Sequence, residues 1–165
     1  MNSIRISITT LTAAAALSLA ACGGTAGTPG GGAAAGPSSA ALIHTTSITV
    51  GSKTETVLKK SKGLTLYYFK PDTATTIACT GGCASNWPPL LATSGAPTSN
   101  PSLPGQLTVL NGANGNQVLY NGHPLYTYIK DGDSGDAYGQ GIGGKWFAAT
   151  PDLAPATAAS SPPSY

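Results

Sequence analysis

The sequence predicts an all-β fold: a small single domain built from two pseudo-symmetric β repeats that share one core. The chain matches itself without a gap when it is shifted by 59 positions, which aligns residues 47–92 with residues 106–151 and indicates a repeated unit. The aligned segments are rich in β-branched and aromatic residues, which favour strands. No segment of the domain carries the 3.6-residue apolar stripe of an amphipathic helix. One repeat is too small to bury both of its faces, so we expect the two repeats to pack together.

The self-match falls on distinctive residues. It places Trp87 on Trp146, and these are the only two tryptophans of the chain. The other aligned pairs include Tyr67 with Tyr126, Phe69 with Tyr128, Asp72 with Asp131, Gly63 with Gly122 and Gly82 with Gly141. Residues 93–105 join the repeats and carry proline or glycine at five positions, so we expect a loop there.

The predicted strands follow from short apolar and aromatic runs between turn residues. They are residues 48–50, 64–69, 107–110, 118–120, 124–129 and 145–148. The pair Asn121-Gly122 supplies the positive φ angles of a two-residue hairpin turn between the fourth and fifth strands. The pair Lys62-Gly63 is expected to play that part in the first repeat.

The first 21 residues have the layout of a bacterial signal peptide, with Arg5 before an uncharged, largely apolar stretch. That stretch is too short and too rich in serine and threonine for a permanent membrane span. Leu19-Ala20-Ala21-Cys22 resembles the lipobox of bacterial lipoproteins, in which the cysteine is lipidated and becomes the first mature residue. The alternative is an ordinary secretory signal with an incidental cysteine. We therefore expect an anchor on Cys22 at the extracytoplasmic side of a membrane, facing the periplasm or in the outer membrane of a Gram-negative cell.

The composition of the remaining sequence separates a linker and a tail from a central domain. Residues 22–43 form a linker rich in Gly, Ala, Thr, Ser and Pro, and residues 153–165 form a similar tail. Such segments bury too little apolar surface to fold, so we expect both to be disordered around a domain at residues 44–152. A flexible linker of this length has a mean reach of about 25 Å. The small net charge of +2 gives no basis for nucleic-acid binding.

Two groups of charges are unevenly placed. One contains Lys53, Lys59, Lys60 and Lys62, and the other contains Asp131, Asp133 and Asp136. We interpret both as solvated surface. Residues 131–136 look superficially like a calcium loop, but position six is Asp136 instead of glycine and position twelve is Ile142 instead of glutamate. A polar turn is the simpler interpretation, and a loose oxygen-ligand calcium site is the alternative.

The repeated motif resembles a known family. Tyr67-x-Phe69-x-x-Asp72 and Tyr126-x-Tyr128-x-x-Asp131 both fit the pattern Y-x-[FWY]-x-x-D, and each is followed by a tryptophan. Together these residues resemble the bacterial secreted-repeat lipoproteins that carry this motif. The resemblance implies export, anchoring and a repeated fold. It implies no biochemical activity, because none is established for that family.

Two roles are open for the motif. Residues two apart on a strand face the same side, so Tyr67 with Phe69 and Tyr126 with Tyr128 would form aromatic pairs on one face. The aspartate lies at the strand end, where it can accept hydrogen bonds from a turn. The motif therefore builds either the core or a platform of aromatic rings for a ligand. General acid–base use of Asp72 with Asp131 is a weaker third interpretation.

Cys79 and Cys83 flank a Gly-Gly pair that allows the sharp turn a disulfide needs. Export to an oxidising compartment favours a structural disulfide. The alternatives are a thiol pair that binds a soft metal such as Cu(I) with His44 or His123, and an electron carrier. The sequence leaves the cofactor unknown.

The sequence carries no nucleophile elbow, metalloprotease helix or phosphate loop. The main hypothesis is therefore a non-catalytic lipoprotein of the cell envelope with a binding or structural role and an unknown partner. The alternative is an extracytoplasmic metal-handling or redox protein that uses Cys79 and Cys83.

Overall fold

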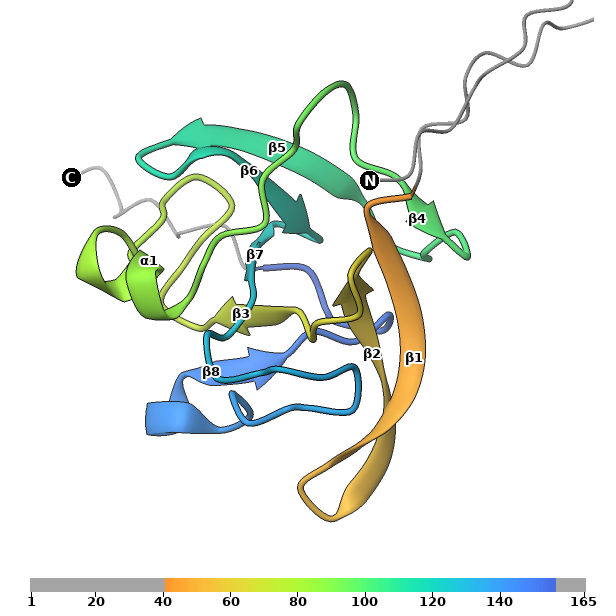
Figure 1. Ribbon diagram of the computed structural model, residues 1–165. Helices are drawn as coiled ribbons and strands as arrows, with labels where there is room; N and C mark the ends of the chain where they lie inside the picture. Colours follow the sequence, from red (N-terminus) through yellow and green to blue (C-terminus); the bar gives the residue numbers. More distant parts are fainter. Residues whose placement is uncertain (1–40, 157–165) are drawn as a thin grey trace, which may run out of the picture. The chain divides into compact units, whose positions relative to one another are not determined.

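The computed structural model describes residues 41–156, in which antiparallel strand pairs predominate (Figure 1). The predicted signal peptide, Cys22, nearly all of the linker and most of the tail lie outside these residues. The elements are β1 (Ile43–Val50), β2 (Lys53–Lys60), β3 (Tyr67–Phe69), α1 (Gly82–Asn86), β4 (Ser99–Asn100), β5 (Leu107–Gly112), β6 (Gly115–Tyr120), β7 (His123–Tyr126), η1 (Ile142–Gly144) and β8 (Trp146–Ala148). The all-β expectation is confirmed.

Each repeat opens with a hairpin. Strands β1 and β2 pair over eight residues each, and β5 and β6 pair over six. The turn between β6 and β7 has φ values of 49° at Asn121 and 80° at Gly122, as the positive-φ prediction requires. Sequence reasoning missed β2, because its charged residues interrupt the apolar alternation. It also missed the two-residue strand β4 inside the joining loop and the single short turn of helix α1.

Within residues 41–156 the strands form two sheets, with orders β2-β1-β4 and β5-β6-β7-β3-β8. Strand β3 of the first repeat therefore lies between β7 and β8 of the second repeat (Figure 1). Tyr67 pairs with Tyr126 in the β3–β7 register. These two residues hold the same position in the two repeats, so the pair marks the pseudo-twofold axis. The equivalent of β8 in the first repeat contains Pro88 and Pro89, which lack the N–H groups that a ladder needs.

Two clusters make the core, and both contain residues from both repeats. The first cluster comprises Ile48, Val50, Val57, Tyr67, Cys79, Trp87, Tyr126, Trp146 and Ala148. The second comprises Ile43, Leu58, Leu66, Leu90, Val118, Tyr120, Leu125 and Ala149. Neither repeat can bury its apolar residues alone, because each cluster is completed by the other repeat.

Contacts within the described part of the chain reach beyond residues 44–152 at both ends. Ile43 is fully buried in β1. At the other end, the Ala156 N–H donates to the Asn121 carbonyl at 2.8 Å, and the Asn121 side chain donates to the Leu153 carbonyl at 2.7 Å. These bonds attach residues 153–156 to the turn between β6 and β7. No helix among residues 41–156 is long and apolar enough to cross a membrane.

Candidate functional site

The motif tyrosines and aspartates are bonded reciprocally between the repeats. The Tyr67 hydroxyl donates to Asp131 Oδ2 at 2.6 Å, and the Tyr126 hydroxyl donates to Asp72 Oδ2 at 2.6 Å. Strand pairing of Tyr67 with Tyr126 aims each hydroxyl at the loop that follows the other repeat's strand. Each tyrosine is therefore hydrogen-bonded to an aspartate of the other repeat.

The second carboxylate oxygen of each aspartate accepts a hydrogen bond from the loop that follows that aspartate. Asp72 Oδ1 accepts the Ala78 N–H at 2.7 Å, and Asp131 Oδ1 accepts the Tyr138 N–H at 3.1 Å. Both aspartates are only 5% exposed, so the interpretation of Asp131 as solvated surface was wrong. The carboxylates thus bind loop backbone groups, as turn residues do, and also bind a tyrosine of the other repeat.

Burial controls the protonation of these pairs. It raises the pKa of Asp72 and of Asp131, against the opposite effect of their hydrogen bonds. It also raises the pKa of Tyr67 and Tyr126 far above 10, with the bonded carboxylates acting in the same direction. The tyrosine hydroxyls therefore stay protonated and act as hydrogen-bond donors at any physiological pH.

The remaining motif rings form one stack. Phe69 stacks on Trp146 with ring centroids 4.4 Å apart, and Tyr128 stacks on Trp87 at 4.3 Å. Trp87 and Trp146 face each other at 3.7 Å with their planes 2° apart. Both tryptophans are 5% exposed, whereas the two outer rings are half-buried. Trp87 belongs to one repeat and Trp146 to the other, so the stack crosses the pseudo-twofold axis.

Tyr67 and Tyr126 complete this arrangement. Tyr67 meets Trp87 edge-on at 5.5 Å, and Tyr126 meets Trp146 edge-on at 5.2 Å. We call the eight motif residues together the aromatic–acid cluster: Tyr67, Phe69, Asp72, Trp87, Tyr126, Tyr128, Asp131 and Trp146. The tryptophan faces cover each other and the outer rings, so the broad ring surfaces are used inside the protein. This geometry fits a core role for the motif better than a ligand platform.

Gly139 packs directly on the cluster. A Cβ at this position would lie 2.7 Å from two ring carbons of Tyr67 and 2.9 Å from a ring carbon of Trp87. We expect Gly139→Ala to cost about 1–3 kcal/mol of unfolding free energy, as overpacking does. Gly135→Ala is the matched control, since its Cβ would meet nothing within 4 Å. Urea unfolding measures both, and equal effects would contradict this packing.

Lys59 is a buried residue of the site that sequence reasoning placed wrongly on the surface. It is 2% exposed, and its Nζ donates to Thr65 Oγ1 at 2.6 Å and to the Ser134 carbonyl at 2.8 Å. Burial lowers its pKa, while Asp131 and Asp136 act in the opposite direction. The second repeat has Val118 at the matching position. No local pattern in this run of lysines indicates the burial of Lys59, which depends on the loop of the other repeat.

Cys79 and Cys83 form the predicted disulfide, with their Cα atoms 5.2 Å apart. Cys79 is fully buried in the first core cluster, and helix α1 begins inside the disulfide loop. A disulfide sulfur is not a thiolate and does not act as a strong metal ligand. In this oxidised state the pair therefore acts as a covalent link that holds the loop after Asp72.

Removing this link tests its contribution. We expect the double variant Cys79→Ala/Cys83→Ala to lose about 2 kcal/mol of unfolding free energy, the chain-entropy value for so short a loop. Urea unfolding of the oxidised wild type and of the variant gives the difference. A variant as stable as the wild type would show that loop packing alone holds this segment.

His44 and His123, the candidate partners of a thiol-bound metal, each have a backbone carbonyl beside the ring. His44 Nδ1 lies 3.2 Å from the Asn100 carbonyl, and His123 Nε2 lies 3.0 Å from the Ala154 carbonyl. The second nitrogen of His123 is buried and has no hydrogen-bond partner among the residues that the structure describes. Among the described residues 41–156, no group of three or more His, Cys, Asp or Glu side chains is arranged to hold a metal ion.

Acidification is expected to weaken the domain through His123. Burial lowers its pKa from the ordinary value of 6.5, against smaller effects of the Ala154 carbonyl and Asp72. The folded state therefore resists protonation, and the free energy of unfolding should fall as pH drops through about 6.5. Urea midpoints at pH about 7.5 and about 5.5 should differ less in His123→Gln than in the wild type. His44→Gln is the control, and a wild-type response in His123→Gln would contradict the assignment.

The acidic loop at residues 131–136 is held by hydrogen bonds between its own side-chain and backbone groups. Asp136 Oδ2 accepts the N–H groups of Gly132 and Asp133 at 2.8 and 2.9 Å. Asp131 is bonded to Tyr67, as described above. These contacts are those of a polar turn, which was the simpler of the two interpretations.

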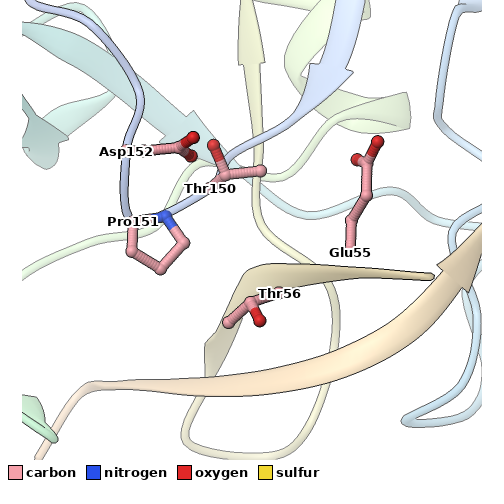
Figure 2. Close-up of a pocket in the computed structure, with 5 residues that line it drawn as sticks. All are labelled: Glu55, Thr56, Thr150, Pro151 and Asp152. Atoms are coloured by element: carbon pink, nitrogen blue, oxygen red, sulfur yellow. The ribbon is translucent and has the colours of Figure 1, made fainter. Parts of the chain in front are cut away.

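One surface pocket lies away from the aromatic–acid cluster. Figure 2 shows its lining, which is Glu55, Thr56, Thr150, Pro151 and Asp152 around a hollow of about 680 Å³. The carboxylates of Glu55 and Asp152 lie on opposite sides, with Thr150 between them. This open recess presents carboxylate and hydroxyl oxygens, and it contains none of the eight motif residues.

These features define a class of protein: a two-repeat all-β domain in which each repeat completes the core of the other. A family model described as a secreted repeat of unknown function (Lipoprotein_15) matches the chain twice, over residues 49–91 and 108–150, which is more than half of its length. The chain belongs to this family, and it is a secreted protein with an extracellular or cell-envelope location. Comparisons with curated proteins and with solved structures find no match.

Proposed function

We propose that this protein is a lipid-anchored, non-catalytic module of the cell envelope that binds or holds a partner outside the cytoplasmic membrane. The proposal rests on one observation: the motif side chains are hydrogen-bonded to and stacked on one another inside the domain. Both motif aspartates are buried and bonded twice, and the tryptophans cover each other. A general acid or base must reach its substrate. The repeated motif therefore supports the fold, and the outer surface of the domain is where a partner would bind.

The anchor in this proposal is Cys22, which ends the sequence Leu19-Ala20-Ala21-Cys22. Acyl chains on that cysteine would hold the protein at a membrane by about 0.8 kcal/mol for each buried methylene group. The linker that follows would let the domain move about 25 Å from its anchor on average. A module of this kind is displayed near the membrane without a membrane-spanning segment.

Labelling with an alkyne analogue of palmitate tests the anchor. The full chain, expressed in a bacterium with lipoprotein processing, should incorporate the label and sediment with membranes. Cys22→Ser should lose the label, whereas Ser38→Ala in the linker should keep it. An unlabelled wild type, or a labelled Cys22→Ser variant, would refute lipidation at this residue.

A panel of envelope substrates tests the non-catalytic role. Purified protein should not hydrolyse glycan, peptide or phospholipid substrates above the background of a mock purification. Measurable turnover that disappears in Asp72→Asn or Asp131→Asn would overturn the proposal, provided that circular dichroism shows the variant folded.

A further inference from the structure

The stacked rings of the aromatic–acid cluster form a continuous column through the core. Their order is Phe69, Trp146, Trp87 and Tyr128, with centroid separations of 4.4, 3.7 and 4.3 Å and interplanar angles of 25°, 2° and 23°. Rings stacked at this separation have overlapping π orbitals. Tryptophan and tyrosine are also the aromatic side chains that lose one electron most readily. We propose, beyond the function given above, that this column carries one-electron oxidising equivalents from the tryptophan pair to the phenol of Tyr128.

The geometry of the tryptophan pair favours a positive charge. Neutral aromatic rings prefer offset or edge-on contacts with centroids about 4.5–7 Å apart, because face-to-face quadrupoles repel. Trp87 and Trp146 instead lie parallel at 3.7 Å. When one electron is removed, the remaining charge spreads over both rings and the contact becomes attractive. An arrangement that is unfavourable for neutral rings is therefore well suited to a shared radical cation.

The surroundings of the pair act in the same direction. Tyr67 and Tyr126 meet the two indoles edge-on. Their hydroxyls donate hydrogen bonds to Asp131 and Asp72, respectively. In their ionised form these buried carboxylates place negative charge near the rings, in a medium where charges interact strongly. Ionised carboxylates in these positions would therefore stabilise a radical cation on the tryptophan pair.

The two ends of the column differ in chemistry. Phe69 and Tyr128 occupy matching positions of the repeats and are both half-buried. A phenylalanine ring is hard to oxidise, whereas a phenol loses an electron and its proton together. The radical is therefore expected to leave the core at Tyr128 and not at Phe69. This difference between the two repeats determines the direction in which the radical moves along the column.

Oxidation begins at the tryptophan pair. A one-electron oxidant, such as a peroxide-derived radical, accepts one electron from the tryptophan pair and leaves a radical cation. The Tyr128 O–H bond breaks: its electron fills the vacancy on the indoles, its proton passes to water, and a phenoxyl radical remains. An external small-molecule thiol then transfers a hydrogen atom to the phenoxyl oxygen, which restores Tyr128 and leaves a thiyl radical on the small molecule. Oxidising equivalents that enter the core thus leave it without breaking a bond of the fold.

The experiment oxidises the full chain in detergent with photogenerated tris(bipyridine)ruthenium(III), and follows the radicals by transient absorption and electron paramagnetic resonance. The wild type should give a tyrosyl radical that forms as the tryptophan radical decays. Tyr128→Phe should lose this tyrosyl signal and retain the tryptophan radical. This variant should fold, because the first repeat carries Phe69 at the same position.

Two further variants make the test decisive. Tyr138→Phe is the matched control, since Tyr138 is 65% exposed and lies outside the column, and it should behave as the wild type does. Adding Phe69→Tyr to Tyr128→Phe should restore the tyrosyl signal at the opposite end. The proposal fails if Tyr128→Phe keeps the full signal, if Tyr138→Phe removes it, or if the radical settles on Tyr67 or Tyr126.

Discussion

Replacing Trp146 with alanine is expected to bring the domain close to unfolding. The indole contacts Phe69, Trp87 and Tyr126, so its removal leaves a cavity where the two repeats meet. Truncation of a buried tryptophan typically costs about 3–5 kcal/mol. Small domains have a total stability of about 5–15 kcal/mol. Urea unfolding of the variant should therefore show a greatly reduced midpoint or no folded baseline.

The matched control for this substitution is Phe147→Ala. Phe147 follows Trp146 in β8 and points to the opposite face of the sheet, where it is half-buried against Tyr68. Its loss should therefore cost clearly less. If both variants lose the same free energy, the ring stack has no special part in joining the repeats.

Replacing Asp131 with alanine should lower the free energy of unfolding by about 3 kcal/mol, which is the second large effect that we expect. The change leaves the Tyr67 hydroxyl and the Tyr138 N–H without their acceptor in a buried place. It also removes the negative charge that acts on the buried Lys59 amine. Asp133→Ala is the control: this neighbouring aspartate is exposed, and its loss should change stability by less than about 0.5 kcal/mol.

A double-mutant cycle tests whether the bond between the repeats carries this effect. The single variants are Tyr67→Phe and Asp131→Asn, and the coupling between them should be about 1–2 kcal/mol. The same cycle on Tyr126 and Asp72 should give a similar coupling, because the two bonds are equivalent by pseudo-symmetry. Strictly additive losses in both cycles would show that the reciprocal bonds do not join the repeats.

These reciprocal contacts explain why the motif occurs twice. A single repeat contains a tyrosine, an aspartate and a tryptophan, but each of them lacks the partner that it has in the full domain. Tyr67 needs Asp131, and Trp87 needs Trp146. The repeat is therefore half of a core, and the second copy supplies the other half.

The sequence by itself determined the features that depend on neighbouring residues and on internal repetition. The offset of 59 positions located both repeats, and the Asn121-Gly122 pair predicted its turn because few residues tolerate positive φ. The spacing of Cys79 and Cys83 across two glycines predicted their disulfide. Each of these depends on the local geometry of a few bonds.

Only the tertiary structure decided which groups meet across the pseudo-twofold axis. The sequence indicated that Tyr67 and Asp72 belong to one motif, but it could not show that each is bonded to the other repeat. Nor did it reveal the burial of Lys59 or the attachment of residues 153–156. The physical reason is that these contacts arise when strand β3 enters the sheet of the second repeat. That pairing joins residues more than fifty positions apart, and no local pattern of the chain encodes it.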